Sequence, residues 1–337
     1  MKQKVKIAIL GYGHIGRKHA EMVFQNQDYH LVALIDPKFK SENLDQNISV
    51  DHFTSLQDFL QSDISADVIA ICTPNGLHYE QTKLIVEKGI HAIIEKPITL
   101  NAEEAQELEQ LAARNNVNLF PVMQNRFSPP ALWLKSLMES KVLGKIFMVQ
   151  ISCFWNRNDQ YYTKESWRGT KALDGGTLYT QFSHYLDIMY WLFGDITNIK
   201  SKFADFNHTE LTEFEDSGIV TFDLNSGGMG SFTFSTAVWN ENLESSLTII
   251  AENGSVKVGG QYMNHVEKCV IKDYNAPELP ETNLANDYGS FKGSAQNHQH
   301  LYKNVIDFLK EGKEIHTTTD DSVQVLKIIE RIYAQNS

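Results

Sequence analysis

Cysteine is scarce in this sequence, and so are long apolar runs. The 337 residues include three cysteines, Cys72, Cys153 and Cys269, which are far apart and form no C-x-x-C pair. This excludes a disulfide framework and a cysteine-based zinc site, so no metal is expected. Cys72 lies within an apolar run and is expected to be a reduced core thiol. No apolar run reaches 18 residues and no stretch has the form of a secretory signal, so we expect a cytoplasmic protein without membrane spans.

The sequence also has few positively charged residues compared with acidic ones. Lysine and arginine number 30 against 42 acidic residues, which gives a formal net charge of −12. Nucleic acids and anionic membranes require an electropositive face, so neither is expected as the main partner. A local basic pocket for a phosphorylated ligand is still allowed. The length and the ordinary hydrophobic share of 42% indicate a globular chain of two domains.

The first third of the chain alternates short apolar runs with amphipathic stretches. The apolar runs are typical of buried parallel strands and occur at Val5–Leu10, Leu31–Ile35, Val68–Cys72, Ala92–Ile94 and Asn118–Val122. Helical periodicity fills the intervals, at Ile15–Gln25, Ser55–Gln61, Tyr79–Lys88 and Ala102–Asn115. Asn101 is expected to cap the last of these helices, and Gly89 to end the one before it. Residues 1–124 are therefore predicted to form a Rossmann α/β domain with a doubly wound parallel sheet.

The pattern changes after about residue 125. Helices are expected at Pro130–Ser140 and Gly176–Phe193, with a long strand at Lys145–Trp155 between them. Strands without intervening helices follow at Ile196–Phe206, Ser217–Leu224, Met229–Val238, Ser246–Ala251, Ser255–Val258 and Val266–Lys272, then a polar loop over Asn275–Ala295. Closing helices are expected at about Gln299–Lys310 and Ser322–Ala334, the last capped by Thr319 or Asp320. Residues 125–337 are predicted to form an α+β domain with a mainly antiparallel open sheet, whose uncovered face favours a homodimer or homotetramer.

A glycine-rich turn, Gly11-Tyr12-Gly13-His14-Ile15-Gly16, follows the first predicted strand and opens the first helix. Its first glycine permits the tight turn, its second lets backbone amides approach a pyrophosphate, and its third lets the helix pack on the strand. Asp36 ends the second strand, 20 residues after Gly16. A carboxylate there can accept both adenosine-ribose hydroxyls and repels a 2′-phosphate, so NAD is favoured over NADP, although Lys38 lies close enough to weaken the preference.

Two further motifs follow neighbouring strands of the predicted sheet. Glu95-Lys96-Pro97 ends one strand, and Cys72-Thr73-Pro74-Asn75 with His78 ends another. At the carboxyl edge of a Rossmann sheet these residues face the nicotinamide, and a lysine there can stabilise a developing alkoxide. Taken alone, Lys96 would be an ordinary surface lysine. We expect a cis bond between Lys96 and Pro97, because the lysine must be directed inward from a strand end.

The combination of motifs resembles the glucose–fructose oxidoreductase / inositol dehydrogenase / MocA (Gfo/Idh/MocA) family over essentially the whole chain. The resemblance comprises the glycine turn, the two strand-end motifs, Asn125-Arg126-Phe127, and Asp174-Gly175-Gly176 followed by His184-Tyr185-Leu186-Asp187. It implies that Lys96 and His184 are the catalytic pair. The residues expected at the cofactor are Gly11, Gly13, His14, Ile15, Gly16, Asp36, Thr73, Asn75, His78, Glu95, Lys96, Asn125, Trp167 and Arg168.

One position departs from the family pattern. Many members have an aspartate four residues before the catalytic histidine, where this chain has Thr180. A Lys–Asp–His relay is therefore absent, so either His184 takes the proton without an acidic partner at that position or Lys96 does so itself. The alternative for His184 is a packed histidine on an apolar helix.

The second domain carries an aromatic and arginine-rich stretch before the catalytic helix. Trp155–Tyr162 and Trp167–Thr170 supply aromatic faces, which suit sugars and bases, and arginines, which suit phosphate or carboxylate. The same residues could instead form a minicore. Substrate contacts are expected from Lys96, Arg157, Tyr161, Tyr162, Thr180 and His184.

The Y-Y-x-x-x-x-W-R-G-T pattern resembles the family branch that oxidises C3 of UDP-linked N-acetylated hexoses or hexuronates. That resemblance implies a 3-keto sugar product, for amino-sugar or surface-polysaccharide biosynthesis. The alternatives are an inositol or aldose dehydrogenase of the same family, or a catalytically silent NAD-binding protein.

Overall fold

The computed structural model describes residues 4–39, 50–289 and 291–336. The chain forms two compact units, one of Met1–Val122 with His298–Val323 and one of Met123–Asn297 with Gln324–Ser337. The first boundary lies two residues from the predicted one. The segment 298–323 belongs with the N-terminal unit, whereas the sequence pattern places it in the second domain. None of the helices within the described ranges is both long enough and apolar enough to cross a bilayer.

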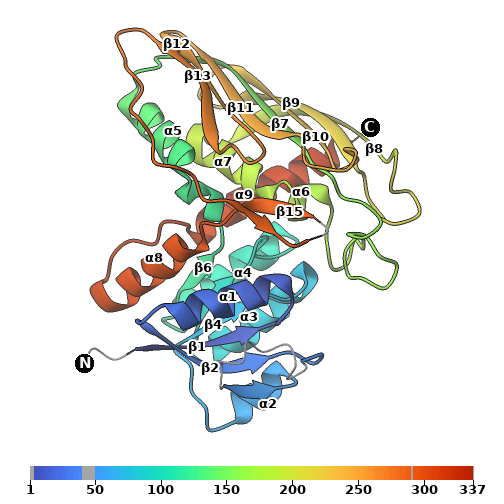
Figure 1. The fold of residues 1–337 in the computed structure, drawn as a ribbon, viewed down its shortest axis with the longest axis vertical. Coiled ribbons are helices and arrows are strands. Elements are labelled where there is room, and N and C mark those ends of the chain that lie inside the picture. The colour runs from blue at the N-terminus through green and yellow to red at the C-terminus, as the bar shows by residue number, and fades with distance from the viewer. Residues whose placement is uncertain (1–3, 40–49, 290, 337) are drawn as a thin grey trace. The chain divides into compact units, whose positions relative to one another are not determined.

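The first unit is built on a six-stranded sheet in which every pairing is parallel (Figure 1). The order is β3 (Asp51–Phe53), β2 (Tyr29–Ile35), β1 (Val5–Leu10), β4 (Val68–Ile71), β5 (His91–Ile94) and β6 (Leu119–Pro121). The helices are α1 (His14–Gln25), α2 (Leu56–Gln61), α3 (His78–Glu87) and α4 (Ala102–Arg114). Strand β4 is completely buried, as expected for a strand covered on both faces. The predicted Rossmann sheet is confirmed, and the short edge strand β3 is an addition to it.

Local signals set the ends of two helices as the sequence predicts. The Asn101 side chain accepts a hydrogen bond from the Glu104 N–H at 2.8 Å and caps α4. Gly89 follows α3 with a φ of +72°, in the left-handed region that glycine adopts without strain. For the last helix, α9 (Thr319–Ala334), the capping side chain is Thr318, one residue earlier than expected.

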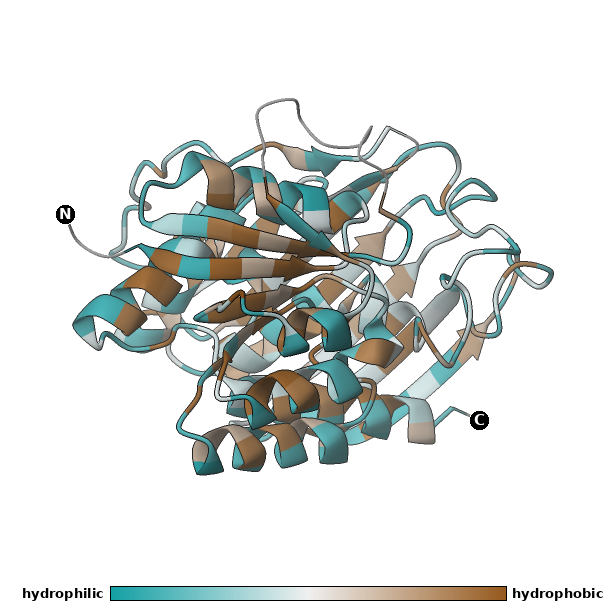
Figure 2. Cartoon of the chain, turned by 90° about the horizontal axis from the view of Figure 1, so that it is seen from below, coloured by the Kyte–Doolittle hydropathy of each residue, from teal (hydrophilic) through white to brown (hydrophobic). Residues whose placement is uncertain are grey.

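The helix α8 (His298–Glu311) packs on the first unit, which explains why residues 298–323 belong there. Tyr302 accepts a hydrogen bond from the Tyr29 hydroxyl at its carbonyl, 2.8 Å away. The Phe308 ring meets Phe120 edge-on at 5.6 Å. A helix with one apolar face can cover either domain, so its position in the sequence does not say which of the two units it joins. Figure 2 shows that the helices carry hydrophobic residues on one side and hydrophilic residues on the other.

The second unit is built on a seven-stranded sheet of order β13-β12-β11-β7-β10-β9-β8. All pairings are antiparallel except that of β7 with β10. The strands are β7 (Ile146–Phe154), β8 (Ile196–Ala204), β9 (Ser217–Leu224), β10 (Met229–Ser235), β11 (Glu244–Ala251), β12 (Gly254–Gly259) and β13 (His265–Ile271). A hairpin of β14 (Ala285–Asp287) and β15 (Lys292–Ala295) occupies the predicted polar loop. The predicted mainly antiparallel sheet is confirmed.

The helical side of this sheet carries α5 (Pro129–Ser140), α6 (Thr177–Thr180) and α7 (Ser183–Phe193) (Figure 1). The sequence predicts one helix over Gly176–Phe193, but the structure breaks it after Thr180. The break places the Phe182 ring against Phe232 and Phe234 of β10, with ring centroids 6.3 and 5.3 Å away. Burying this ring against the sheet therefore anchors the chain between α6 and α7.

Candidate functional site

The glycine turn of the first unit has the geometry of a phosphate cradle. Gly11 has a φ of +88°, and a Cβ there would lie 2.8 Å from the Cys72 carbonyl oxygen. A Cβ on Gly16 would lie 1.9 Å from the Gly11 carbonyl oxygen, so the close packing of α1 requires glycine. A Cβ on Gly13 would meet nothing within 4 Å. The open space at Gly13, at the uncapped N-terminus of α1, fits a dinucleotide pyrophosphate. His14 and Ile15 form the first turn beside it, with His14 exposed.

Asp36 follows β2, as the sequence predicts for the ribose-binding carboxylate. Its Oδ2 accepts a hydrogen bond from the Tyr12 N–H and its Oδ1 accepts one from the Lys38 N–H, both at 2.7 Å. The carboxylate is therefore fixed against the glycine turn. Each oxygen keeps a second lone pair, so the group can still accept the two ribose hydroxyls.

The strand-end motifs lie at the same carboxyl edge of the parallel sheet. Lys96 follows β5 with a half-buried side chain, and its bond to Pro97 is cis, as predicted. His78 is completely buried, with its ring nitrogens 2.8 Å from the Pro97 carbonyl oxygen and 3.0 Å from that of Thr73. Burial lowers the pKa of His78. His78 therefore links the two turns that carry Thr73 and Lys96. Asn75 is buried at the same turn.

Glu95 lies in a buried polar cluster that sequence reasoning missed. Its Oε1 accepts a hydrogen bond from His19 Nε2 at 2.9 Å, and His298 Nε2 lies 3.4 Å away. The other nitrogen of His19 accepts a hydrogen bond from the Tyr302 hydroxyl at 2.8 Å. Burial raises the pKa of Glu95, but the bonds from the two histidines outweigh burial and hold the pKa well below its usual range. Glu95 is thus a buried anion beside Lys96 that is engaged by protein groups. In the sequence, the local sign of this cluster is His19, which lies three residues after Gly16.

In the second unit, His184 lies in the first turn of α7 and is almost completely buried. Three residues further on, Asp187 accepts two hydrogen bonds from Arg126, at 2.8 Å from Nε and 2.6 Å from Nη2. Arg126 belongs to the short helix η3 (Gln124–Phe127), whose Asn125 is also buried. This bidentate ion pair fixes α7, and with it the histidine, against η3.

The aromatic and arginine-rich stretch forms a compact group around Tyr161. The guanidinium groups of Arg157 and Arg168 lie over the Tyr161 ring at 5.0 and 4.7 Å from its centroid, and both also lie over Phe291. Arg157 is buried and donates to the carbonyl oxygens of Asn156 and Lys292. Arg168 is half-buried, beside Trp167, and is the more accessible of the two cations.

Two predicted substrate contacts have other partners in the structure. Tyr162 is completely buried in a cluster with Tyr161 and Phe214, and burial raises the pKa of its hydroxyl well above the usual range. It packs the core. The Thr180 hydroxyl donates to the carboxylate of Asp174. Asp174 and the Arg126–Asp187 pair are further functional candidates that the sequence shows only as parts of longer motifs.

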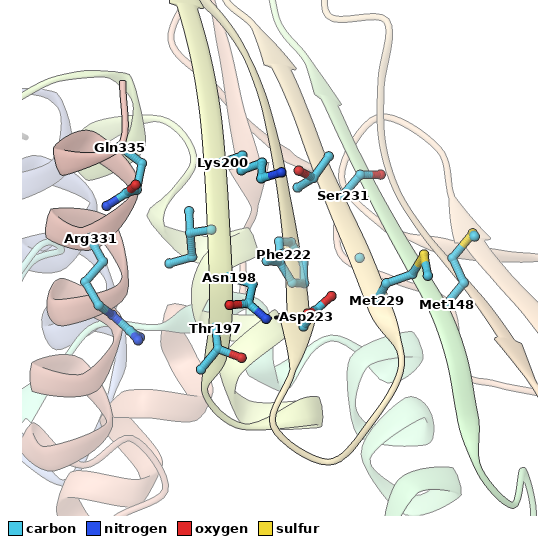
Figure 3. Close-up of a pocket in the computed structure, with 13 residues that line it drawn as sticks. Met148, Thr197, Asn198, Lys200, Phe222, Asp223, Met229, Ser231, Arg331 and Gln335 are labelled. Carbon is cyan, nitrogen blue, oxygen red and sulfur yellow. Dashed lines mark hydrogen bonds between the residues drawn. The ribbon is translucent and has the colours of Figure 1, made fainter. Parts of the chain in front are cut away.

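A surface hollow of about 1,100 Å³ lies on the seven-stranded sheet and has a different lining (Figure 3). Met148 of β7, Met229 of β10 and Asp223 of β9 contribute to it. None of the predicted site residues lines this hollow. A second hollow of about 490 Å³ lies between Trp133 of α5 and the segment 276–282. The described cysteines are all free, with Cys72 and Cys153 buried.

Comparisons with known proteins cover nearly the whole chain. Residues 5–122 match the model of the "Oxidoreductase family, NAD-binding Rossmann fold", and residues 132–257 match the "GFO/IDH/MocA C-terminal domain". The crystal structure of the WlbA dehydrogenase from Chromobacterium violaceum, in complex with NADH and UDP-GlcNAcA, is 30% identical with a TM-score of 0.89, covering 99% of this chain and 94% of that one. The corresponding Bordetella pertussis structure is 28% identical with a TM-score of 0.85, covering 99% and 96%.

Curated relatives are more distant. The scyllo-inositol 2-dehydrogenase (NADP(+)) IolW of Bacillus subtilis is 24% identical over 97% of this chain and 92% of its own length. An uncharacterized oxidoreductase of Synechocystis, also 24% identical, is matched over 62% of its length. The fold, the match to the NAD-binding family model and the two NADH-bound WlbA structures agree on an NAD-binding oxidoreductase. The chain therefore belongs to the Gfo/Idh/MocA family of oxidoreductases.

Proposed function

We propose that this oxidoreductase oxidises the C3 hydroxyl of a UDP-linked N-acetylated hexose or hexuronate to the 3-keto sugar, for amino-sugar or surface-polysaccharide biosynthesis. One observation carries the proposal. The two WlbA dehydrogenases, which bind NADH and UDP-GlcNAcA in their crystal structures, match 99% of this chain at 28 and 30% identity. The half-buried Arg168 supports an anionic ligand, because guanidinium pairs bidentately with phosphate or carboxylate.

The proposed chemistry assigns two residues to the proton. NAD, when bound, would supply the acceptor for the hydride that leaves the carbinol carbon. The hydroxyl loses its proton as its C–O bond becomes a carbonyl, and Lys96 and His184 are the groups that we propose to stabilise the alkoxide and take this proton. General acid–base assistance contributes about 10²–10⁴-fold. Lys96→Ala and His184→Ala should therefore each lower turnover by that order and leave NAD affinity nearly unchanged. Lys88→Ala, at an exposed position, is the matched control.

A panel of substrates tests the reaction. The purified protein is incubated with NAD and with UDP-GlcNAc, UDP-GlcNAcA, scyllo-inositol or glucose, and the keto product is identified by mass spectrometry under single-turnover conditions. This readout works even if NADH stays in the site. A ligand at a hundred times its Kd should also stabilise the fold by about 2.7 kcal/mol in a thermal-shift assay. A 3-keto UDP-sugar is the expected product.

Two other functions are separated by the same panel. The relationship to IolW favours an inositol or aldose dehydrogenase as the second candidate. Turnover of scyllo-inositol without turnover of either UDP-sugar would select it. A catalytically silent NAD-binding protein would be stabilised by NAD but would give no product from any substrate.

The cofactor is tested separately by titration with NADH and NADPH. Asp36 should favour NADH, and Asp36→Ala should narrow the difference between the two affinities. Equal affinities in the unmodified protein would contradict this assignment.

We further propose a homo-oligomer that packs through the open side of the seven-stranded sheet. On that side lie Met148, Ile219, Met229 and Ile250, whose exposures are 46, 56, 55 and 39%. Figure 3 shows Met148 and Met229 next to each other on neighbouring strands. An exposed apolar face of this kind is typical of an interface. Light scattering should give the mass of a dimer or tetramer. Met229→Glu should lower this mass, whereas Phe206→Glu, a control at a more exposed loop position, should not.

A further inference from the structure

A buried carboxylate of the second unit joins two segments of the proposed site. Asp174 is completely buried. Its Oδ2 accepts a hydrogen bond from the Gly169 N–H at 2.8 Å, and its Oδ1 accepts one from the Thr180 hydroxyl. Gly169 follows Arg168 in the Trp-Arg-Gly-Thr turn, and Thr180 ends α6 one turn before His184. A single carboxylate thus ties the accessible arginine to the segment that leads into the histidine.

The turn held by Asp174 has little freedom of its own. Gly169 has a φ of +87°, and a Cβ there would lie 2.6 Å from the Leu211 carbonyl oxygen. Its own carbonyl accepts a hydrogen bond from the Glu213 N–H at 2.8 Å. The Asp174 N–H donates to the Thr170 carbonyl at 2.9 Å, which closes the turn. The carboxylate therefore fixes a rigid turn, and Arg168 with it.

The other end of the connection is equally constrained. Thr180 is buried, and its hydroxyl proton is engaged by Asp174. The Phe182 ring, packed at 5.3 Å from Phe234 and 5.6 Å from Trp155, anchors the chain before α7. At the position where many family members have an acidic residue, this chain has the Thr180 hydroxyl. That hydroxyl donates a hydrogen bond to the buried carboxylate of Asp174, six residues earlier.

We propose that Asp174, acting through Thr180, is a positioning residue that supplies the buried negative charge missing at position 180. This inference rests on the proposed function of Lys96 and His184. A carboxylate in a buried, low-dielectric setting acts over a longer range than one in water. It favours the protonated imidazole, the state that His184 reaches when it accepts the substrate proton.

Other charged and titratable groups surround this carboxylate and remain in any variant of it. Tyr162 packs beside it, and the charge of Asp174 contributes, after burial, to the raised pKa of that hydroxyl. Arg157 and Glu215 act on the same tyrosine from two further segments. Glu215 accepts hydrogen bonds from Thr177 and Tyr333, and burial raises its pKa. On α7, Asp187 is paired with Arg126.

Moving the charge tests the proposal. Asp174→Asn removes it, and the double variant Asp174→Asn with Thr180→Asp restores it at the position that the family uses. We expect Asp174→Asn to lower kcat about 10–100-fold, which is no more than the fall expected when the proton acceptor itself is removed. The KM for NAD should change less than about threefold. The double variant should regain most of kcat. Asp159→Asn, an exposed carboxylate in the same unit, is the control.

A second readout does not depend on turnover. The imidazole of His184, identified in NMR spectra by its loss in His184→Asn, should titrate at lower pH in Asp174→Asn and return toward its original midpoint in the double variant. A kcat within twofold of the unmodified enzyme in Asp174→Asn would overturn the proposal. So would a lower kcat that the double variant does not restore, since Asp174 would then only stabilise the turn. If the UDP-sugars are not substrates, the proposed function fails, while the titration still decides the role of Asp174.

Discussion

The ion pair between Arg126 and Asp187 gives the sharpest test of how the second unit is held together. Two hydrogen bonds of 2.8 and 2.6 Å join the side chains, which are 3 and 1% exposed. Removing one partner of a buried pair leaves the other charge in the interior, which costs about 3–5 kcal/mol. Arg126→Ala and Asp187→Ala should therefore each lower the free energy of unfolding by that amount.

Urea unfolding and differential scanning calorimetry measure this effect. For a domain of 150–250 residues, each kcal/mol shifts Tm by about 2–4 °C, so a fall of about 6–20 °C is expected. Replacing both partners, with Arg126→Met and Asp187→Leu, should cost less than the sum of the single changes, because no charge is left buried. The control is Lys257→Ala, which breaks a 2.7 Å pair with Glu267 whose side chains are 39 and 31% exposed.

The control pair should contribute less than about 1 kcal/mol, as exposed pairs do. If Arg126→Ala costs no more than Lys257→Ala, water reaches the Arg126–Asp187 pair and the inference from burial is wrong. The same result would remove the reason for treating α7 as fixed against η3.

Three further changes follow from the local geometry. Gly13→Val should leave the thermal stability of the first unit unchanged, because a Cβ there meets nothing within 4 Å, yet it should weaken NADH binding in a fluorescence titration. Gly11→Val should lower both the thermal stability and the affinity for NADH, because Gly11 has a φ of +88° and its Cβ would lie 2.8 Å from a carbonyl oxygen. Asn101→Ala should cost about 1 kcal/mol in urea unfolding by removing the α4 cap, and an unchanged midpoint would show that another group takes its place. Burial raises the pKa of Glu215 above its ordinary value of 4.5, so its contribution to stability is complete below that pH and is lost as pH rises through the raised pKa. Glu215→Gln should therefore flatten the fall in stability between acidic and neutral pH, and an unaltered pH dependence would contradict the assignment.

Much of the first unit follows from the sequence alone. The strand β1 and the turn from Gly11 to Gly16 are local features, because apolar runs, glycine spacing and a helix N-terminus within a few residues determine them. Asp36 is found in the same way, by its place at a strand end. The family's motifs then locate Lys96 and His184, although their joint action on a substrate stays a prediction.

Other features depend on contacts between residues that are distant in the sequence. His298 and Tyr302 join His19 around Glu95 only because α8 packs on the first unit, and an amphipathic pattern does not say which unit it will cover. The break before α7 likewise comes from Phe182 packing on β10, which helical periodicity does not report.

The same limit applies to the side chains of the proposed site. Tyr162 and Arg157 have the residue types of a sugar and phosphate site, yet burial places the tyrosine in a core and gives the arginine backbone carbonyl partners. Asp174 shows the reverse. The sequence marks it only as a loop residue, whereas in the fold its buried carboxylate accepts a hydrogen bond from the Gly169 N–H. The sequence by itself determined the kinds of group available and the turns that carry them. Tertiary packing decided which of those groups are exposed, because burial and hydrogen bonding depend on neighbours that no local pattern specifies.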